Sequence, residues 1–177
     1  MAFSDPQKII GLIGLKHGEH VADLGSGSGF YSLFAAKAVG PQGRIYAIDV
    51  QKDLLGKLKS ELQRQHATNV DVIEGDVERV GGTALKAGSV TTAIAANLLF
   101  QIEDKENFVL EVKRILGPGG RIVVVDWSDS FGGIGPAKEA IYPLDKAIQL
   151  FEKAGFADAE ILLAGDHHYG FVMRKKQ

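Results

Sequence analysis

The sequence has 177 residues, 45% hydrophobic and 24% charged, with a formal net charge of −2 at pH 7. This length suits one compact domain with its own core, and the slight acidity disfavours a broad nucleic-acid-binding surface. The absence of cysteine excludes disulfides, thiolate metal ligands and a cysteine nucleophile. Because no apolar run approaches the ~18 residues of a membrane helix and the start lacks a signal-peptide pattern, we expect a cytoplasmic protein without a membrane span.

The N-terminal segment 1–18 is predicted to hold one helix. Its Asp-Pro pair at 5–6 suits a first helical turn, and the isoleucines that follow fall on one side. A short buried strand is expected at 21–24. Apolar residues recur at helical spacing from Phe30 to Ala38, so the glycine-rich stretch at 25–29 joins this strand to a helix.

Strands and helices continue to alternate through the middle of the chain. A strand that returns through a helix to another strand is typical of a parallel sheet. The run over 122–125 is apolar throughout, as expected for a strand buried on both faces. In chain order we predict a strand at 44–49, a helix at 52–65, strands at 70–74 and 91–96, a helix at 103–116 and a strand at 122–125.

The pattern changes after residue 125. Residues 126–142 are rich in glycine and show no clear periodicity, and we interpret them as a loop on the substrate side. A helix is predicted at 144–154. The last two strands, 159–163 and 169–174, have no helix between them and must pair antiparallel. We therefore predict a single domain over 1–177, an α/β doubly wound sheet of seven mostly parallel strands with an antiparallel last strand.

The stretch "VADLGSGSGF" places Gly25, Gly27 and Gly29 directly after the first strand. Glycines in such a turn let a ligand approach the backbone closely, although a tight turn without a ligand would also explain them. The dinucleotide pattern G-x-G-x-x-G fails, because its last glycine would fall on Phe30 or Ser32. An NAD site is therefore disfavoured.

Two further aspartates close the next two strands. Asp49 ends the second strand, 20 residues after Gly29. A carboxylate at this place can accept hydrogen bonds from both hydroxyls of a ribose, or it can cap the helix that follows. Asp76 ends the third strand in "EGDVERV". It can accept a hydrogen bond from an amine, or act as a plain N-cap.

The run from Asp23 to Gly29, D-x-G-x-G-x-G, resembles motif I of the class I S-adenosylmethionine-dependent methyltransferases. The stretches "GLKHGEHVADLGSGSGFYSLFAAKAVGPQGRIYAIDV", "VIEGDVE" and "FVLEVKRILGPGGRIVVVDW" are similar to this family and stand in its order. The likeness is greatest to the small-molecule branch that includes ubiquinone/menaquinone biosynthesis methyltransferases. It implies a Rossmann-like sheet of order 3-2-1-4-5-7-6, S-adenosylmethionine as cofactor and S-adenosylhomocysteine as product.

The resemblance also implies roles for individual residues in the cofactor site. The glycines face the methionine portion, Asp23 holds the loop and the amino end, and Asp49 binds the ribose. Asp76 takes the adenine amino group, while the N–H of Val77 takes a ring nitrogen. The full predicted set is Asp23, Gly25, Ser26, Gly27, Gly29, Asp49, Val50, Asp76, Val77 and Asn97.

Asn97 follows the fourth strand in "ANLLF". Family members that methylate the amines of bases or glutamine carry [D/N/S]-P-P-[Y/F/W] here. Leu98 and Leu99 replace both prolines, and this disfavours that chemistry. Asn97 then either contacts the methionine end of the cofactor or caps the loop.

Candidates on the acceptor side are few. Trp127 either stacks on an acceptor ring or closes the edge of the domain by packing. One of His167 and His168 could act as a base near neutral pH, but we favour a surface-turn role for both. We predict no metal site, because Asp166 and the two histidines are adjacent and their side chains diverge.

The predicted function is methyl transfer to an oxygen, nitrogen or carbon of a small molecule. Arsenic methylation is excluded because the resembling enzymes need cysteines. Substrate selection would fall to the N-terminal helix, to the loop 126–142 or to a second chain, which leaves a homodimer open. Two alternatives are a cofactor-binding regulatory or partner protein without catalysis, and an RNA or protein methyltransferase.

Overall fold

The computed structural model describes residues 4–131 and 133–176, so residues 1–3, 132 and 177 of the predicted segments lie outside the described part. Within these residues, seven strands form one sheet of order β3-β2-β1-β4-β5-β7-β6. The pairs from β3 to β5 are parallel, and β7 pairs antiparallel with both β5 and β6. The predicted fold class and strand order are confirmed.

The strands are β1 (His20–Leu24), β2 (Arg44–Asp49), β3 (Val70–Glu74), β4 (Val90–Ala96), β5 (Leu116–Trp127), β6 (Phe156–Leu162) and β7 (His168–Lys175). The helices are α1 (Pro6–Ile13), α2 (Phe30–Val39), α3 (Lys52–Arg64), α4 (Lys105–Ile115) and α5 (Leu144–Lys153), with short 3₁₀ turns η1 (Leu99–Gln101) and η2 (Lys138–Ala140). No helix in the described ranges is both long and apolar enough to cross a bilayer.

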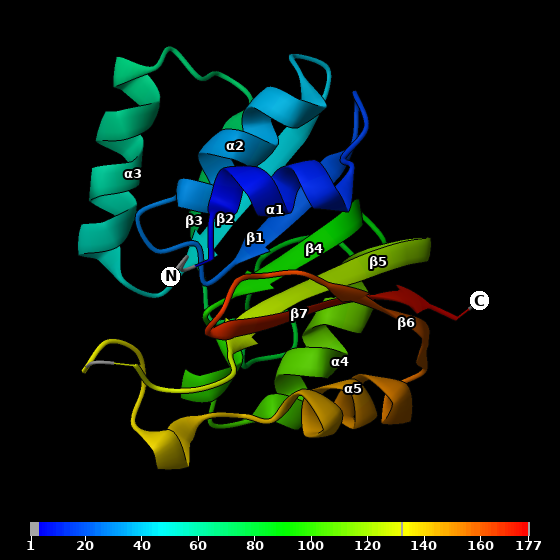
Figure 1. The fold of residues 1–177 in the computed structure, drawn as a ribbon. Helices are drawn as coiled ribbons and strands as arrows, with labels where there is room; N and C mark the ends of the chain where they lie inside the picture. The colour runs from blue at the N-terminus through cyan, green and yellow to red at the C-terminus, as the bar shows by residue number, and fades with distance from the viewer. Residues whose placement is uncertain (1–3, 132, 177) are drawn as a thin grey trace.

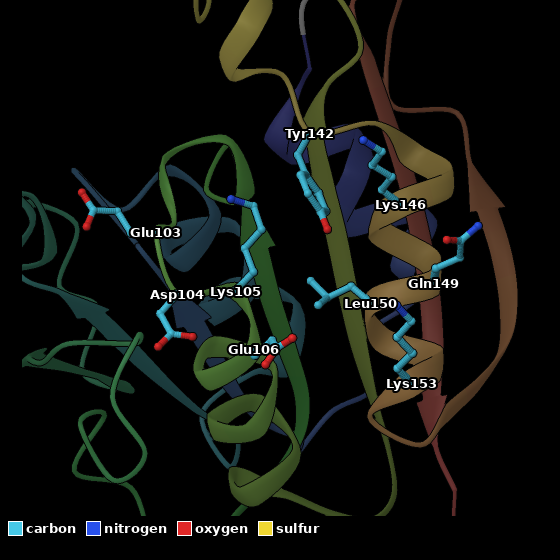
Figure 2. A pocket seen from close by; sticks show the side chains of 9 residues that line it. All are labelled: Glu103, Asp104, Lys105, Glu106, Tyr142, Lys146, Gln149, Leu150 and Lys153. Carbon is cyan, nitrogen blue, oxygen red and sulfur yellow. The ribbon is translucent and has the colours of Figure 1, made fainter.

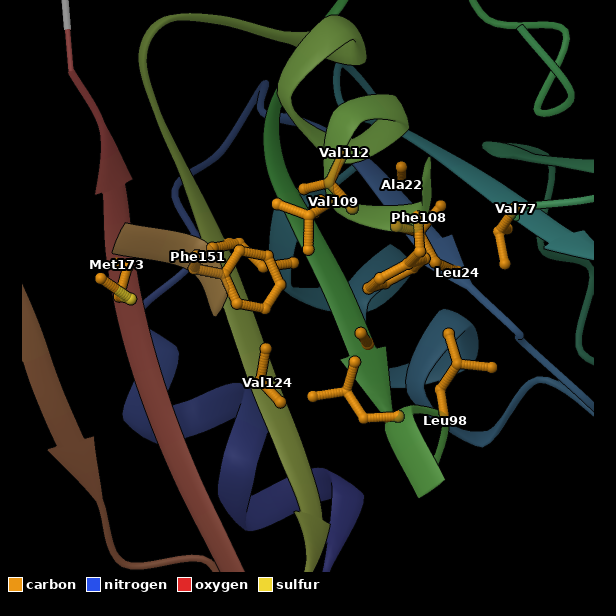
Figure 3. Packing of buried hydrophobic residues seen from close by; sticks show 14 of the residues in the cluster. Ala22, Leu24, Val77, Leu98, Phe108, Val109, Val112, Val124, Phe151 and Met173 are labelled. Atoms are coloured by element: carbon orange, nitrogen blue, oxygen red, sulfur yellow. The ribbon is translucent and has the colours of Figure 1, made fainter. Parts of the chain in front are cut away.

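Helices cover both faces of the sheet. In Figure 1, α1, α2 and α3 lie on one face and α4 and α5 on the other. Alternate residues of β5 point to opposite faces, so Val123 and Val125 pack toward α1 and α2, while Ile122 and Val124 pack toward α4 and α5. Each face of the sheet thus has its own hydrophobic core, and Figure 3 shows Val124 beside Phe151 of α5 in the larger one. Burial of both faces explains the apolar runs of the central strands.

The element boundaries differ from the prediction in a few places. β5 begins at Leu116, so the turn "GPGG" that ends α4 lies inside this strand, where the pairing with β4 shifts register. β6 begins at Phe156 rather than at 159, because its first residues already pair with the end of β7. Phe30 starts α2 but is 65% exposed, unlike Leu33.

A buried ion pair ties the loop after β3 to α4. The Glu111 side chain is 1% exposed and pairs with Arg114, one helical turn along, at 2.7 Å. It also accepts hydrogen bonds from the backbone N–H of Gly81 and from Thr83. Burial raises the pKa of Glu111, but its hydrogen bonds from Arg114, Thr83 and Gly81 outweigh burial and lower it to about 2.

We expect Glu111→Gln to lower the free energy of unfolding by about 2 kcal/mol at pH 7, because it leaves Arg114 and the loop without a charged partner. The folded pKa lies below the ordinary value, so this stabilisation is present above pH 4.5 and is lost as the pH falls toward 2. Urea unfolding of both proteins at pH 7 and pH 3 measures the difference.

Glu61→Gln is the matched control. Glu61 forms the same i, i+3 pair with Arg64, but the Arg64 side chain is 73% exposed. We expect little change in stability from this variant. Equal losses in the two variants would contradict the role given to Glu111.

Candidate functional site

The loop after β1 is built from glycines in the left-handed region, with φ of 67° at Gly25, 54° at Gly27 and 85° at Gly29. A Cβ at Gly25 would lie 2.6 Å from Leu98 Cδ1, and one at Gly29 would lie 2.2 Å from Leu58 Cδ1. A Cβ at Gly27 would meet nothing closer than 4.0 Å. The chain itself therefore crowds Gly25 and Gly29, whereas Gly27 faces open space.

Asp49 connects this loop to the end of β2. Its Oδ2 accepts a hydrogen bond from Gly27 N at 2.8 Å, and its Oδ1 accepts one from Gln51 N at 2.8 Å. Ser26 N also donates to the carbonyl of Ile48 at 2.9 Å. Each carboxylate oxygen keeps a further lone pair for a ligand, and Asp49 lines both hollows described next.

Two adjoining hollows lie at the carboxyl ends of the parallel strands. One, of about 550 Å³, includes Asp23, Gly27, Tyr31 and Asn97 in its lining. The other, of about 190 Å³, includes Val50, Asp76 and Val77. Their linings share Gly25, Asp49, Gln51 and Gln101, so together they form one cleft that crosses the ends of β1, β2 and β3.

Nine of the ten predicted cofactor residues line this cleft. Gly29 does not, and its contact with Leu58 gives it a packing role. Sequence reasoning missed several residues of the lining, most of which carry no local motif: Ser4, Tyr31, Gln51, Leu54, Glu78, Leu98, Gln101 and Ile102. Gln51 could have been found, because it directly follows the Asp-Val pair at 49–50.

Asp23 is 2% exposed, and its Oδ2 accepts a hydrogen bond from Ser32 Oγ. Burial raises the pKa of Asp23 to about 6, and the nearby charge of Asp49 acts in the same direction. Asp76 lies at the other end of the cleft. Its Oδ1 accepts from Glu78 N at 2.9 Å, so it caps the following turn and still faces the smaller hollow.

Asn97, Trp127 and His168 meet beside the larger hollow. Trp127 and His168 are directly opposite in the β5–β7 pairing, with ring centroids 4.2 Å apart. His168 Nε2 lies 3.0 Å from Asn97 Oδ1. The buried carboxylate of Asp126 holds the backbone on both sides of this cluster. Its Oδ2 accepts hydrogen bonds from Leu98 N and Leu99 N, and its Oδ1 accepts one from Trp127 N. Burial raises the pKa of Asp126 to about 6.

The surface-turn interpretation of the two histidines is wrong. His167 is 8% exposed and His168 is 7% exposed. His167 Nδ1 lies 2.7 Å from Asp129 Oδ1, and the ring of Phe131 stacks on the His167 ring with centroids 4.5 Å apart. The loop after β5 therefore folds over His167. In the described ranges, no group of three His, Asp or Glu side chains is arranged to hold a metal ion.

A larger hollow, of about 790 Å³, lies between the start of α4 and α5. Figure 2 shows its lining, in which charged side chains of both signs surround Tyr142 and Leu150. Lys105 Nζ lies 4.8 Å from the centre of the Tyr142 ring. None of the predicted site residues lines this hollow, so it is separate from the cleft at the strand ends.

The sheet order, the glycine loop after β1 and the aspartates near the ends of β2 and β3 define the Rossmann-like class of S-adenosylmethionine-dependent methyltransferases. The sequence pattern of the family described as "Methyltransferase domain" matches residues 15–159, and the chain belongs to this family. The predicted family, the class I S-adenosylmethionine-dependent methyltransferases, is therefore confirmed.

Known relatives agree with this assignment. The chain is 31% identical over 109 residues to an arsenite methyltransferase of Halobacterium salinarum, covering 62% of this chain and 27% of that protein. It is 28% identical over 120 residues to the ubiquinone/menaquinone biosynthesis C-methyltransferase UbiE of Stutzerimonas stutzeri, covering 67% and 46%. The matches thus span less than half of these curated relatives.

A SAM-dependent methyltransferase from Aquifex aeolicus has a similar structure. The TM-score is 0.88 at 27% identity, and the match covers 97% of this chain and 90% of that one. The residues present here fit the cofactor, because Gly27 leaves open space in the cleft and the Asp49 oxygens keep lone pairs there. The roles of individual residues in binding the cofactor stay predictions.

We expect Gly27→Ala to weaken S-adenosylmethionine binding by about tenfold or more, because the added methyl group would occupy space the ligand needs. Its cost to stability should be limited to the strained φ, about 1 kcal/mol. Gly29→Ala should instead lower stability more, because its Cβ would overlap Leu58. Calorimetric titration and urea unfolding of both variants test this contrast, and the reverse ranking would contradict it.

Asp23 makes stability depend on pH in a predictable direction. Its folded pKa of about 6 lies above the ordinary 3.8, so the stability that Asp23 contributes is fully present below pH 3.8 and is lost as the pH rises through 6. We expect Asp23→Asn to remove on the order of 1 kcal/mol of this loss between pH 5 and pH 7. Asp126, whose pKa burial also raises to about 6, should account for the pH dependence of stability that remains in this variant. If urea unfolding shows the same pH dependence in the variant and in the wild type, the raised pKa does not belong to Asp23.

Proposed function

We propose that the chain transfers the methyl group of S-adenosylmethionine to a flat small molecule bound beside Trp127, with the cofactor lying along the cleft at the strand ends. The observation that carries this proposal is the cleft itself, which places the carboxylates of Asp23, Asp49 and Asp76 along one continuous groove. The spacing of three acidic groups near the carboxyl ends of three adjacent strands suits a ligand with separate amino, ribose and adenine parts.

Each part of the cleft has its own task in this proposal. The open face of Gly27 and the buried Asp23 receive the methionine end. Asp49, held by two backbone N–H groups, accepts from the ribose hydroxyls with its remaining lone pairs. Asp76 accepts from the adenine amino group, and the apolar side chains of Leu98 and Ile102 line the same hollow.

When bound, the cofactor supplies an electrophilic methyl group on a sulfonium. The chain's contribution is to hold the acceptor atom in line with that methyl group and to exclude water. Trp127 and the Phe131–His167 stack offer aromatic surfaces near the end of β5 and the start of β7. These surfaces favour a flat, largely apolar acceptor.

Two acceptor classes are disfavoured by the residues present. Arsenite is the substrate named for one relative, but this chain has no cysteine thiolate to bind a soft arsenic centre. The exocyclic amines of bases or of glutamine are disfavoured because Leu98 and Leu99 replace the two prolines of the corresponding motif. Oxygen and carbon acceptors remain the best supported.

The first experiment is calorimetric titration with S-adenosylmethionine, S-adenosylhomocysteine and NAD. We expect both methionine cofactors to bind, NAD to fail, and Asp49→Asn to weaken binding by about tenfold or more, because it loses a ribose contact and disturbs the Gly27 N–H. Asp53→Asn, an exposed position in the first turn of α3, is the control and should bind normally.

Turnover is then measured with radiolabelled S-adenosylmethionine against panels of phenols, enols and amines. Methylation of phenols or enols and not of amines is the expected result. Failure of the wild-type protein to bind either methionine cofactor would overturn the proposal.

A further inference from the structure

The backbone of Asn97 is fixed from two directions. Its N–H donates to the carbonyl of Val125 at 2.8 Å, and its own carbonyl accepts from Gln101 Nε2 at 2.9 Å. It also has a φ of 53°, a left-handed conformation that asparagine tolerates better than most residues. The carboxamide group therefore has a defined position in the wall of the cleft, where it lines the hollow of about 550 Å³.

The imidazole ring of His168 is equally constrained. It begins β7, packs at a tilt against the Trp127 ring and is 7% exposed. Its Nε2 lies 3.0 Å from Asn97 Oδ1, while its Nδ1 is buried and has no hydrogen-bond partner among the described residues. The ring can thus orient the carboxamide of Asn97 but has no other polar contact through Nδ1.

Two arrangements of this pair are chemically consistent. In one, Nε2–H of His168 donates to Oδ1 of Asn97, and the unprotonated Nδ1 carries the buried lone pair. In the other, the carboxamide is reversed, and a proton must lie on Nδ1 without an acceptor. A buried N–H without a partner costs about 1–3 kcal/mol, and such donors are rarer than unmatched acceptors. The first arrangement is therefore favoured.

The charge state of the ring supports the same choice. Burial lowers the pKa of His168 below its ordinary value, and the neighbouring His167 lowers it further, although Asp129 opposes them. The lowered pKa favours a neutral ring with a single proton, and the first arrangement places that proton on Nε2.

We infer that His168 is a positioning residue that turns the Nδ2 amide of Asn97 toward the cleft, so that this end of the cleft binds a ligand oxygen that accepts a hydrogen bond. The inference rests on the proposed function for the identity of that ligand. Nδ2 donates to none of the described residues, and Asn97 lines the 550 Å³ hollow of the cleft. The oxygen comes either from the cofactor carboxylate or from a phenolate- or enolate-type acceptor, and a cationic amine does not fit here.

The orientation is tested without any ligand. Long-range proton–nitrogen NMR of the ¹⁵N-labelled protein reports which nitrogen of each histidine carries the proton. We expect His168 to be neutral at pH 7 with the proton on Nε2. A proton on Nδ1 would mean a reversed carboxamide with its carbonyl toward the cleft, and would overturn the inference.

The ligand oxygen is identified with three probes. S-Adenosylhomocysteine has a carboxylate, 5′-methylthioadenosine lacks the amino-acid end, and 4-nitrophenol supplies a phenolate in the presence of saturating S-adenosylhomocysteine. Asn97→Asp replaces the amide donor by an anionic oxygen of the same shape. We expect it to weaken one of the two probes that carry an anionic oxygen by about tenfold or more and to leave 5′-methylthioadenosine unchanged.

The outcome separates the two sources of the oxygen. Loss confined to S-adenosylhomocysteine assigns the amide to the cofactor carboxylate, whereas loss confined to 4-nitrophenol assigns it to the acceptor. Unchanged binding of all three probes would overturn the inference. If the wild-type protein binds no S-adenosylhomocysteine, the proposed function fails, but the tautomer measurement still decides the orientation of the pair.

Variants of His168 test whether it acts through Asn97. His168→Leu removes the donor, and we expect it to weaken the same probe that Asn97→Asp weakens. His168→Gln keeps an amide donor and should restore most of the affinity. His17→Gln is the control, because His17 is exposed and lies outside the cleft. Equal losses in the Leu and Gln variants, with both proteins folded by thermal melting, would contradict a positioning role.

Discussion

The site depends on one hydrogen bond, from the backbone N–H of Gly27 to the carboxylate of Asp49. This bond joins the loop after β1 to the end of β2, and the bond from Ser26 N to the Ile48 carbonyl reinforces it. The carboxylate that shapes the loop is also the group predicted to bind the ribose. In the proposed function one carboxylate serves both purposes, because each of its oxygens keeps a lone pair beside its backbone hydrogen bond.

Nine of the ten residues predicted for the cofactor site line one cleft, because parallel strands bring their carboxyl ends to one edge of a sheet. Asp23, Asp49 and Asp76 each end or follow such a strand, so a correct strand order was enough to place them together. The order itself came from the family resemblance rather than from periodicity. Gly29 shows the limit of a motif. A glycine is needed at this position because a Cβ would overlap Leu58 of α3, and no local sequence pattern indicates that contact.

The region after β5, where the acceptor is proposed to bind, could not be predicted to the same depth. The stretch after β5 lacks periodicity, so nothing in the sequence indicates that Phe131 and Asp129 fold back onto His167, 38 residues from Asp129. Two adjacent histidines between two short strands are typical of an exposed turn. Here the pairing of β7 with β5 places His168 opposite Trp127, and the register carries the ring into the interior. Long-range packing decided the burial of both residues.

Asp126 couples the two halves of the site. One of its oxygens accepts a hydrogen bond from the backbone of Leu98, whose side chain packs against Gly25, and the other accepts one from the backbone of Trp127, beside which the acceptor is proposed to bind. A buried carboxylate with several N–H donors fixes both segments at once. A change in the loop beyond Trp127 can therefore alter the proposed acceptor surface while Asp126 keeps the backbone of Leu98 and Leu99 in place.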